Sequence, residues 1–145
     1  MSAEPAREFV DANVLVYAYD ASAGTKHTAA QRLLTRLWDA GTGCVSVQVL
    51  QEFFVTVTRK VAEPLPAAEA ADRIRELSAW KVFTPVAEDV LLAITLHGRA
   101  QLSFWDAMVI HGAAELECDV LWTEHLNHGQ SIQGVRIRDP FRAEE

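Results

Sequence analysis

Residues 103–122 have the sequence SFWDAMVIHGAAELECDVLW, and this stretch decides the fold class. Its apolar residues recur at the i, i+3, i+4, i+7 spacing of an amphipathic helix that begins near Ser103. The stripe consists of Trp105, Met108, Val109, Gly112, Ala113 and Leu116. The apolar run from Cys118 to Trp122 predicts a strand directly after that helix. A helix followed at once by a buried strand is the repeating unit of α/β proteins.

The same alternation continues on both sides of this stretch. Strands are predicted at residues 7–11, 43–46, 80–84 and 135–137, and a polar loop at 123–133. Further helices are predicted from His27 to a cap at Gly41, along the stripe from Leu50 to Val61, after Pro66, and from Glu88 onward. The segment 12–20 suits either a continued strand or a helix. This order predicts right-handed crossovers and a three-layer α/β/α fold with a parallel sheet of about five strands.

The composition and charge of the chain exclude some classes of protein. The 145 residues are 50% hydrophobic, enough for one core, so we expect a single domain over residues 1–145. The chain lacks a basic flank followed by an apolar run and any stretch of about eighteen apolar residues, so we expect a cytoplasmic protein with no membrane partner. The net charge of −7 argues against a broad basic surface for nucleic acid. Nucleic-acid chemistry must therefore be local or assisted by a metal.

Four acids are predicted to meet at one edge of the sheet. Asp11 closes the first strand and Glu124 follows the strand that ends at Trp122, while Glu52 and Asp106 lie early in helices that follow or precede strands. In parallel sheets the working site lies beyond the carboxyl ends of the strands. Clustered carboxylates raise one another's pKa unless a cation neutralises them, and oxygen ligands select Mg²⁺ or Mn²⁺. The pattern therefore predicts metal-assisted phosphodiester hydrolysis.

Each acid also has a purely structural interpretation. Asp106 stands three residues after Ser103, the spacing of a helix-capping pair. Glu52 lies roughly 160° from the apolar stripe on a helical wheel, as a solvated acid would. Glu124 has His125 and His128 beside it, which opens the possibility of imidazole ligation, although loop histidines are usually solvated. Asp11 is the hardest to explain structurally, because an acid that closes a buried strand is costly to desolvate.

With these residues in place, the sequence resembles the PIN-domain family. The resemblance rests on FVDANVLVYAYD at residues 9–20, VQVLQEFF at 47–54, LSFWDAMVI at 102–110, and LWTEHLNHGQ with VRIRDPF at 121–130 and 135–141. These segments occur in the family's order and span nearly the whole chain. The whole is most similar to toxins of the VapC type.

The resemblance implies a site and an activity. Asp11, Glu52 and Asp106 would form the acidic core, with Asp11 and Asp106 as direct ligands of Mg²⁺ or Mn²⁺. Asn13 would orient Asp11 or the bound water; alternatively, its side chain only forms hydrogen bonds with the backbone of the loop. Thr123 would contact metal-bound water or phosphate. The implied activity is a metal-dependent endoribonuclease of a toxin–antitoxin pair, with RNA as substrate and an antitoxin as partner. Because so acidic a chain gathers RNA poorly, a homodimer that forms part of the groove is also expected.

Two further expectations follow from the resemblance. The implied strand order is 3-2-1-4-5, which puts the strands of Cys44 and Cys118 on either side of the first strand. At a strand spacing of about 4.8 Å these cysteines would be about 10 Å apart, too far for a disulfide. Arg59, seven residues after Glu52 and on nearly the same helical face, would touch phosphate, although a plain surface arginine is equally consistent.

One departure from the family pattern concerns the fourth acid. The family places it two residues after the hydroxyl residue, where this chain has His125. The adjacent Glu124 is one candidate to replace this acid. The alternatives are that His125 itself acts as the ligand or that the site holds a single metal. The departure also supports an alternative function, a PIN-fold binding module with weak catalysis or none.

The sequence disfavours two other functions. A phosphatase-like enzyme with Asp11 as nucleophile is disfavoured by Asn13, which stands where a second aspartate is expected. A phospho-receiver domain is disfavoured because no lysine closes the last strand.

Overall fold

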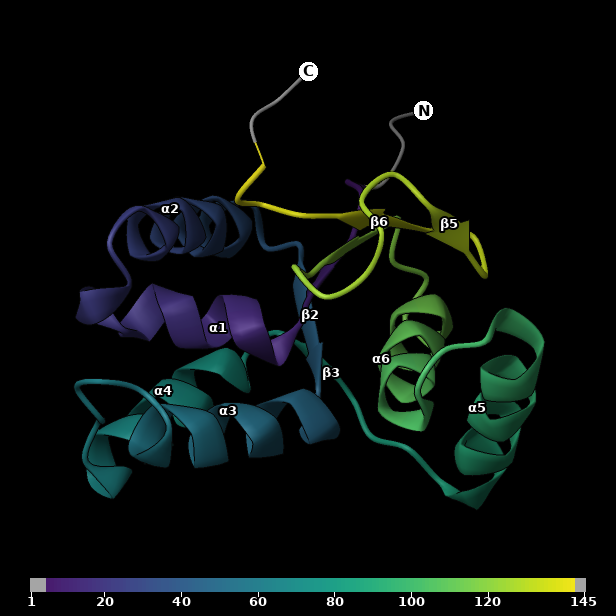
Figure 1. Cartoon of the computed structure of the whole chain (residues 1–145), viewed down its shortest axis with the longest axis horizontal. Coiled ribbons are helices and arrows are strands. Elements are labelled where there is room, and N and C mark those ends of the chain that lie inside the picture. Colours follow the sequence, from purple (N-terminus) through teal and green to yellow (C-terminus); the bar gives the residue numbers. More distant parts are fainter. Residues whose placement is uncertain (1–4, 143–145) are drawn as a thin grey trace.

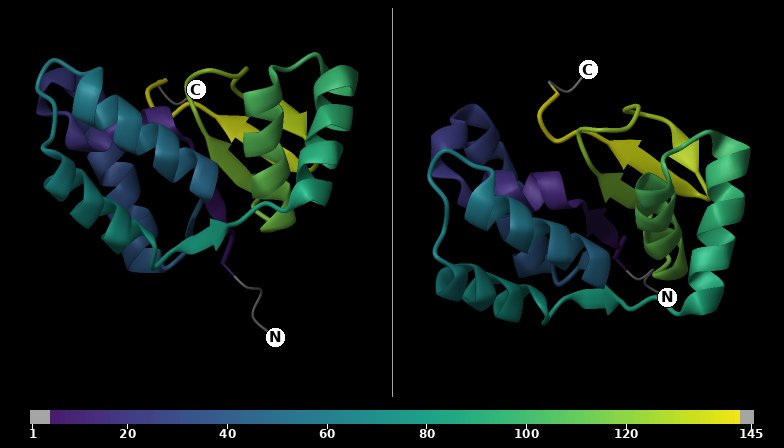
Figure 2. Two further views of the ribbon diagram at one scale, coloured as in Figure 1. Left: turned by 90° about the horizontal axis from the view of Figure 1, so that it is seen from below. Right: turned by 60° about the horizontal axis from the view of Figure 1, so that its bottom comes forward.

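Six strands form one sheet that separates two groups of helices (Figure 1). The computed structural model describes residues 5–142. The elements are β1 (Glu8–Val10), α1 (Ala12–Tyr19), the short helix η1 (Ala21–Ala23), α2 (Thr25–Ala40), β2 (Gly43–Ser46), α3 (Val47–Arg59), α4 (Ala67–Leu77), β3 (Lys81–Phe83), α5 (Ala87–Ala100), α6 (Phe104–Glu115), β4 (Val120–Trp122), β5 (Ser131–Ile132) and β6 (Val135–Arg138). Figures 1 and 2 show α1 to α4 on one side of the sheet and α5 with α6 on the other. The predicted α/β/α architecture is confirmed.

The strand order is β3-β2-β1-β4-β6-β5. Strands β3, β2, β1, β4 and β6 are parallel neighbours, which confirms the expected order 3-2-1-4-5. The sixth strand, β5, pairs antiparallel with β6 through Ile132 and Val135 and lies inside the predicted polar loop. It forms because Gln133 and Gly134 both adopt positive φ, 53° and 79°, as a two-residue hairpin turn requires. A non-glycine residue with positive φ gave no signal in the sequence.

The register of the central strands positions the acids. Val10 pairs with Trp122, so the next residues of each strand, Asp11 and Thr123, emerge side by side at the carboxyl edge of the sheet. The backbone N–H of Asp11 donates to the Trp122 carbonyl at 3.0 Å. Trp122 in turn pairs with Arg138 of β6. The carboxyl ends of β1, β4 and β6 therefore lie next to one another, at the edge of the sheet where the acids were expected to meet.

Capping groups set the ends of the helices around this edge. Asp11 is the N-cap of α1, and its side chain accepts the N–H of Ala12, so the ambiguous segment 12–20 turns into a helix at once. Ser46 caps α3 through Val49 N–H, and Ser103 caps α6. Gly41 ends α2 in the left-handed conformation at φ 69°, as predicted.

Some side chains depart from the sequence expectations. Trp105 was expected in the buried stripe but is 63% exposed, because it lies in the first turn of α6, where the helix enters from solvent. Deeper in α6 every residue from Ala107 to Ala113 is buried. Cys44 and Cys118 are both free, so no disulfide forms, as expected. The neighbouring Cys44 thiol and burial both raise the pKa of the Cys118 thiol.

No helix within residues 5–142 has both the length and the apolar character needed to cross a membrane.

Candidate active site

Asp11 is the centre of the site. Its side chain is 4% exposed, Oδ1 accepts the Ala12 N–H at 2.8 Å, and Oδ2 accepts the Thr123 hydroxyl at 2.9 Å. Burial raises the pKa of Asp11, although these two hydrogen bonds act against the rise, and the negative charge of Glu52 raises it further. An ionised Asp11 is therefore held at a cost, in a place where a cation would relieve it.

Asn13 and Thr123 join the start of α1 to the end of β4. The Asn13 amide donates to Thr123 Oγ1 at 3.3 Å and accepts the backbone N–H of Glu124 at 3.3 Å. Thr123 is fully buried, and its oxygen also accepts the His125 N–H at 3.2 Å. Thr123 thus holds the Asp11 carboxylate, and Asn13 holds Thr123 and the backbone of the following loop.

Glu52 lies on α3 and faces the same region. It is half-buried and accepts a hydrogen bond from Gln48 at 3.0 Å, while Gln48 also contacts the Trp105 carbonyl of α6 at 3.3 Å. A cavity of about 450 Å³ opens beside it, which we call the acidic cavity. Its lining comprises Ala12, Asn13, Val16, Tyr17, Asp20, Glu52, Thr56, Lys60, Val61, Ala62, Glu124 and His125. The structure thus brings Glu52 together with Asn13, Glu124 and His125 from the opposite ends of the chain.

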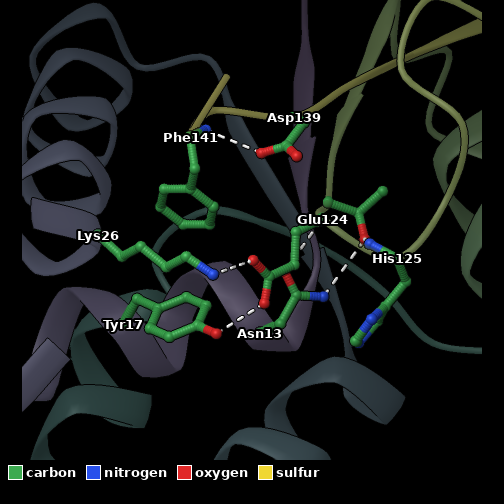
Figure 3. Close-up of polar contacts among 8 residues, drawn as sticks. Asn13, Tyr17, Lys26, Glu124, His125, Asp139 and Phe141 are labelled. Atoms are coloured by element: carbon green, nitrogen blue, oxygen red, sulfur yellow. Dashed lines mark hydrogen bonds and ion pairs between the residues drawn. The ribbon is translucent and has the colours of Figure 1, made fainter. Parts of the chain in front are cut away.

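Glu124 is the acid whose surroundings the sequence did not reveal. Figure 3 shows its carboxylate between Tyr17 and Lys26, with the Tyr17 hydroxyl at 2.6 Å and the Lys26 ammonium at 2.8 Å. Burial alone would raise the pKa of Glu124, but the contacts with Lys26 and Tyr17 hold it below its ordinary value. Tyr17 lies one helical turn after Asn13 on α1. If residues 12–20 had been assigned as a helix from the sequence, Tyr17 would have been predicted on the same face as Asn13.

Asp106 and Arg59, the other predicted residues, do not line the acidic cavity. Asp106 is in the first turn of α6, where its N–H donates to Ser103 Oγ at 3.0 Å. Within the described chain the Asp106 carboxylate makes no hydrogen bond or ion pair, so it is not occupied in the reciprocal half of a capping pair. Arg59 is exposed at the end of α3 and is not among the residues that line the acidic cavity, whereas its neighbour Lys60 is.

Among residues 5–142, one group of three possible metal ligands has all its ligand atoms within 4.8 Å of one another, and it lies elsewhere. It consists of Asp89, His111 and Glu115, on α5 and α6. Asp89 accepts the Val86 N–H at 2.8 Å and contacts His111 Nε2 at 2.8 Å, so its oxygens serve a helix cap and an interhelical contact. The four predicted acids do not form such a group in this arrangement of side chains.

A model of the PIN domain matches residues 9–125, most of the chain. The chain belongs to the PIN-domain family. No curated protein gives a significant match.

Solved structures share the PIN fold at low sequence identity. The Mycobacterium tuberculosis toxin VapC20, described as cleaving the sarcin-ricin loop, aligns with a TM-score of 0.62 and 23% identity over 79% of this chain and 86% of its own. A toxin–antitoxin complex from Klebsiella pneumoniae gives 0.66 and 17%, covering 94% of this chain and 99% of that one. VapBC2 from Rickettsia felis, bound to a promoter DNA fragment, gives 0.64 and 17%, covering 91% and 97%.

The donor groups of this PIN domain fit a hard divalent cation. Asp11 and Glu52 offer carboxylate oxygens, and no lysine or arginine in the described part of the chain hydrogen-bonds Asp11. A buried carboxylate whose pKa is raised, beside a second carboxylate, is the electrostatic setting that Mg²⁺ or Mn²⁺ stabilises. Glu124 is less available, because Lys26 already neutralises it.

Proposed function

We propose that this PIN domain is a metal-dependent endoribonuclease, a hydrolase that cuts RNA phosphodiester bonds as the toxin of a toxin–antitoxin pair. The observation that carries the proposal is the buried Asp11 carboxylate, held by Thr123 at the sheet edge beside Glu52. Family membership and the VapC toxins among its structural neighbours support it.

Each residue has a defined part in this proposal. Asp11 and Asp106 would hold Mg²⁺ or Mn²⁺, and Glu52 would help to bind the ion or to position water. The ion, when bound, supplies an activated water and stabilises charge on the phosphodiester. Thr123 and Asn13 keep Asp11 in one orientation through their hydrogen bonds. Arg59 remains a proposed phosphate contact from the rim of α3.

Glu124 has a different proposed part. Because Lys26 and Tyr17 hold its carboxylate, Glu124 anchors the Lys26 ammonium beside the acidic cavity, where the ammonium can meet a substrate phosphate. Displacement of Lys26 by substrate would free Glu124 as a further carboxylate. His125 lines the same cavity and is the alternative donor at this position.

The test is cleavage of a pool of structured RNAs with Mg²⁺ or Mn²⁺. Wild-type chain is expected to give metal-dependent cuts that a chelator abolishes and that Asp11→Asn lowers by at least about 100-fold. Asp39→Asn, a matched change at an exposed acid of α2, should cut like wild type. The proposal is abandoned if folded wild-type chain, free of antitoxin, cuts nothing.

The alternative is a PIN-fold binding module without hydrolysis. The engagement of Glu124 by Lys26 and Tyr17 favours it, since this leaves fewer free carboxylates at the site. Absence of Mn²⁺ binding at millimolar concentration, together with absence of cutting, would select this alternative.

The proposed partners are an antitoxin and a second copy of the chain. An antitoxin would cover the acidic cavity, most simply with a basic side chain that meets Glu52; two of the structural neighbours are toxin–antitoxin or VapBC assemblies. Dimerisation would use α5 and the residue before it, where Val86 is 64% exposed, Leu91 59% and Ile94 49%. We assign both partners to the cytoplasm, where the RNA substrate lies.

A further inference from the structure

A second cavity, of about 540 Å³, lies between α2 and the segment that follows β6, and we call it the arginine cavity. Figure 1 shows this last segment leading from β6 toward α2. The lining consists of Ala29, Arg32, Leu33, Arg36, Trp122, His128, Arg138, Asp139, Pro140 and Arg142. The proposed function above uses none of these residues.

The cavity concentrates positive charge in an acidic protein. Four of the chain's 13 lysines and arginines line it, although the net charge is −7. Arg36 is paired with Glu8 in a bidentate contact, both oxygens at 3.0 Å. Arg32 and Arg142 make no side-chain hydrogen bond or ion pair within residues 5–142. Two guanidinium groups are thus free to bind an anion.

The remaining arginines are held in place by the floor of the cavity. The Arg138 guanidinium lies 5.1 Å from the centre of the Trp122 ring, a cation–π contact. Trp122 Nε1 donates to Glu8 at 2.9 Å, and Glu8 fixes Arg36. Guanidinium groups held in this way lose little freedom when they bind, and their planar forks match phosphate oxygens.

The arginine cavity adjoins the acidic centre. Trp122 immediately precedes Thr123, whose N–H donates to the Arg138 carbonyl at 2.9 Å and whose hydroxyl holds Asp11. Phe141, next to Arg142, packs edge-on against Tyr17 with ring centres 5.1 Å apart, and Lys26 lies 5.5 Å from the Phe141 ring (Figure 3). A basic and aromatic path therefore links the two cavities along one edge of the sheet.

We propose that the arginine cavity binds the phosphodiester backbone of the RNA substrate next to the cleavage site. This inference rests on the proposed function, and it identifies where an acidic ribonuclease finds the local positive charge that substrate binding requires. An RNA strand with its scissile phosphate near Asp11 would pass Lys26 and Phe141 and place a neighbouring phosphate among Arg32, Arg138 and Arg142. Phosphate fits better than the carboxylates of an acidic peptide because the path leads directly to a centre suited to phosphodiester cleavage.

The test measures RNA binding apart from cleavage. Fluorescein-labelled single-stranded RNA of mixed sequence is titrated with the Asp11→Asn chain at several KCl concentrations, without and with Arg32→Gln/Arg142→Gln. The double change is expected to weaken binding by at least about 10-fold and to lower the salt slope of the affinity by about 1 to 2. Arg75→Gln/Arg99→Gln, which removes two exposed arginines outside the cavity, should stay within about twofold of the parent.

A second arm uses the chain with Asp11 intact. Arg32→Gln/Arg142→Gln should lower kcat/KM for long RNA by about 10-fold, mainly through KM, and leave cleavage of a dinucleotide unchanged. Unaltered RNA affinity and salt slope in a folded double variant would overturn the inference. It would equally be overturned if the double variant lost affinity only for an acidic peptide. If wild type cuts no RNA but the arginine variant loses RNA binding, the proposed function fails while the cavity assignment stands.

Discussion

Asp11 shows how one residue serves both folding and the site. As N-cap of α1 it satisfies a backbone N–H, which stabilises the start of the helix. As a buried carboxylate it carries a desolvation cost that raises its pKa. An asparagine at this position removes the charge and keeps an oxygen for the Ala12 N–H, but its amide NH₂ group replaces the oxygen that accepts the Thr123 hydroxyl. Stability and metal binding should therefore respond in opposite directions when Asp11 is changed.

We expect Asp11→Asn to raise the melting temperature in chelator by about 4 °C, the effect of roughly 1 kcal/mol in a domain of this size. Millimolar Mn²⁺ should raise the melting temperature of wild type, because it binds the folded state, and should leave the variant unchanged. Differential scanning fluorimetry with and without Mn²⁺ measures both effects. Asp39→Asn is the matched control and should follow wild type. A variant less stable than wild type in chelator would contradict the assigned cost of the buried charge.

Between elements, Glu8 ties β1 to α2 and β4. Burial would raise the pKa of Glu8, but hydrogen bonds from Arg36 and Trp122 more than offset this and hold it below its ordinary value. A carboxyl whose pKa is lower in the folded state stabilises the protein above its unfolded pKa, and this stability is lost as the pH falls through the folded pKa.

Glu8→Gln is accordingly expected to lower the free energy of unfolding by about 1–2 kcal/mol at pH 7. The difference between variant and wild type should shrink as the pH falls from the ordinary glutamate pKa of about 4.3 toward the lower folded pKa of Glu8, because the unfolded chain takes up the proton first. Urea unfolding at pH 7 and pH 3.5 measures it. A difference that is the same at both pH values would show that the Glu8 charge is not the cause.

Two glycines provide a matched test of packing between elements. A Cβ at Gly43 of β2 would lie 2.6–2.7 Å from three ring atoms of Trp80, whereas a Cβ at Gly98 of α5 meets nothing within 4 Å. Gly43→Ala should cost about 1–3 kcal/mol, because the indole must move, and Gly98→Ala should gain up to about 1 kcal/mol of helix propensity. Urea unfolding of both variants tests this. Equal effects would refute the close contact with Trp80.

Sequence patterns predicted the elements whose two faces differ. The helices α2, α3 and α4 carry one-sided stripes, and Gly41 marks the end of α2. By contrast α1 buries Val14, Leu15 and Val16 in succession, which gives no periodicity to separate helix from strand. Of the candidate site, Asp11 followed from its place after a strand, and Asn13 followed from the resemblance to the PIN-domain family. The engagement of Glu124 did not, because Lys26 is 98 residues away along the chain.

At the scale of the whole molecule, the exposed apolar side chains are concentrated on one helix. Five of the eight exposed large hydrophobic residues found within residues 5–142 lie between Val86 and Ile94, at α5. The other three are Trp38, Val55 and Trp105, which lie on α2, α3 and α6, so α5 with its N-cap Val86 carries most of the exposed large hydrophobic residues of the described structure. We therefore expect association to depend on α5.

Leu91→Glu/Ile94→Glu is expected to convert a dimer into a monomer, because it places charge in the proposed interface. Light scattering after size exclusion should give a mass near 16.1 kDa for the variant and about twice that for wild type. Val55→Glu changes an exposed apolar residue on α3 instead and should leave the mass of the dimer unaltered. A wild-type chain that is already monomeric at micromolar concentration would exclude dimerisation through α5.

The two outermost strands of the sheet are short. At one border of the sheet β3 has three residues and begins with the exposed Lys81, and at the other β5 has two. Borders this short present few unpaired peptide groups to an incoming chain, and a lysine there discourages it further. A partner that binds by adding a strand to the sheet would therefore form few backbone hydrogen bonds with either border. The folded protein should resist amyloid-like stacking even at concentrations where copies meet through their helices.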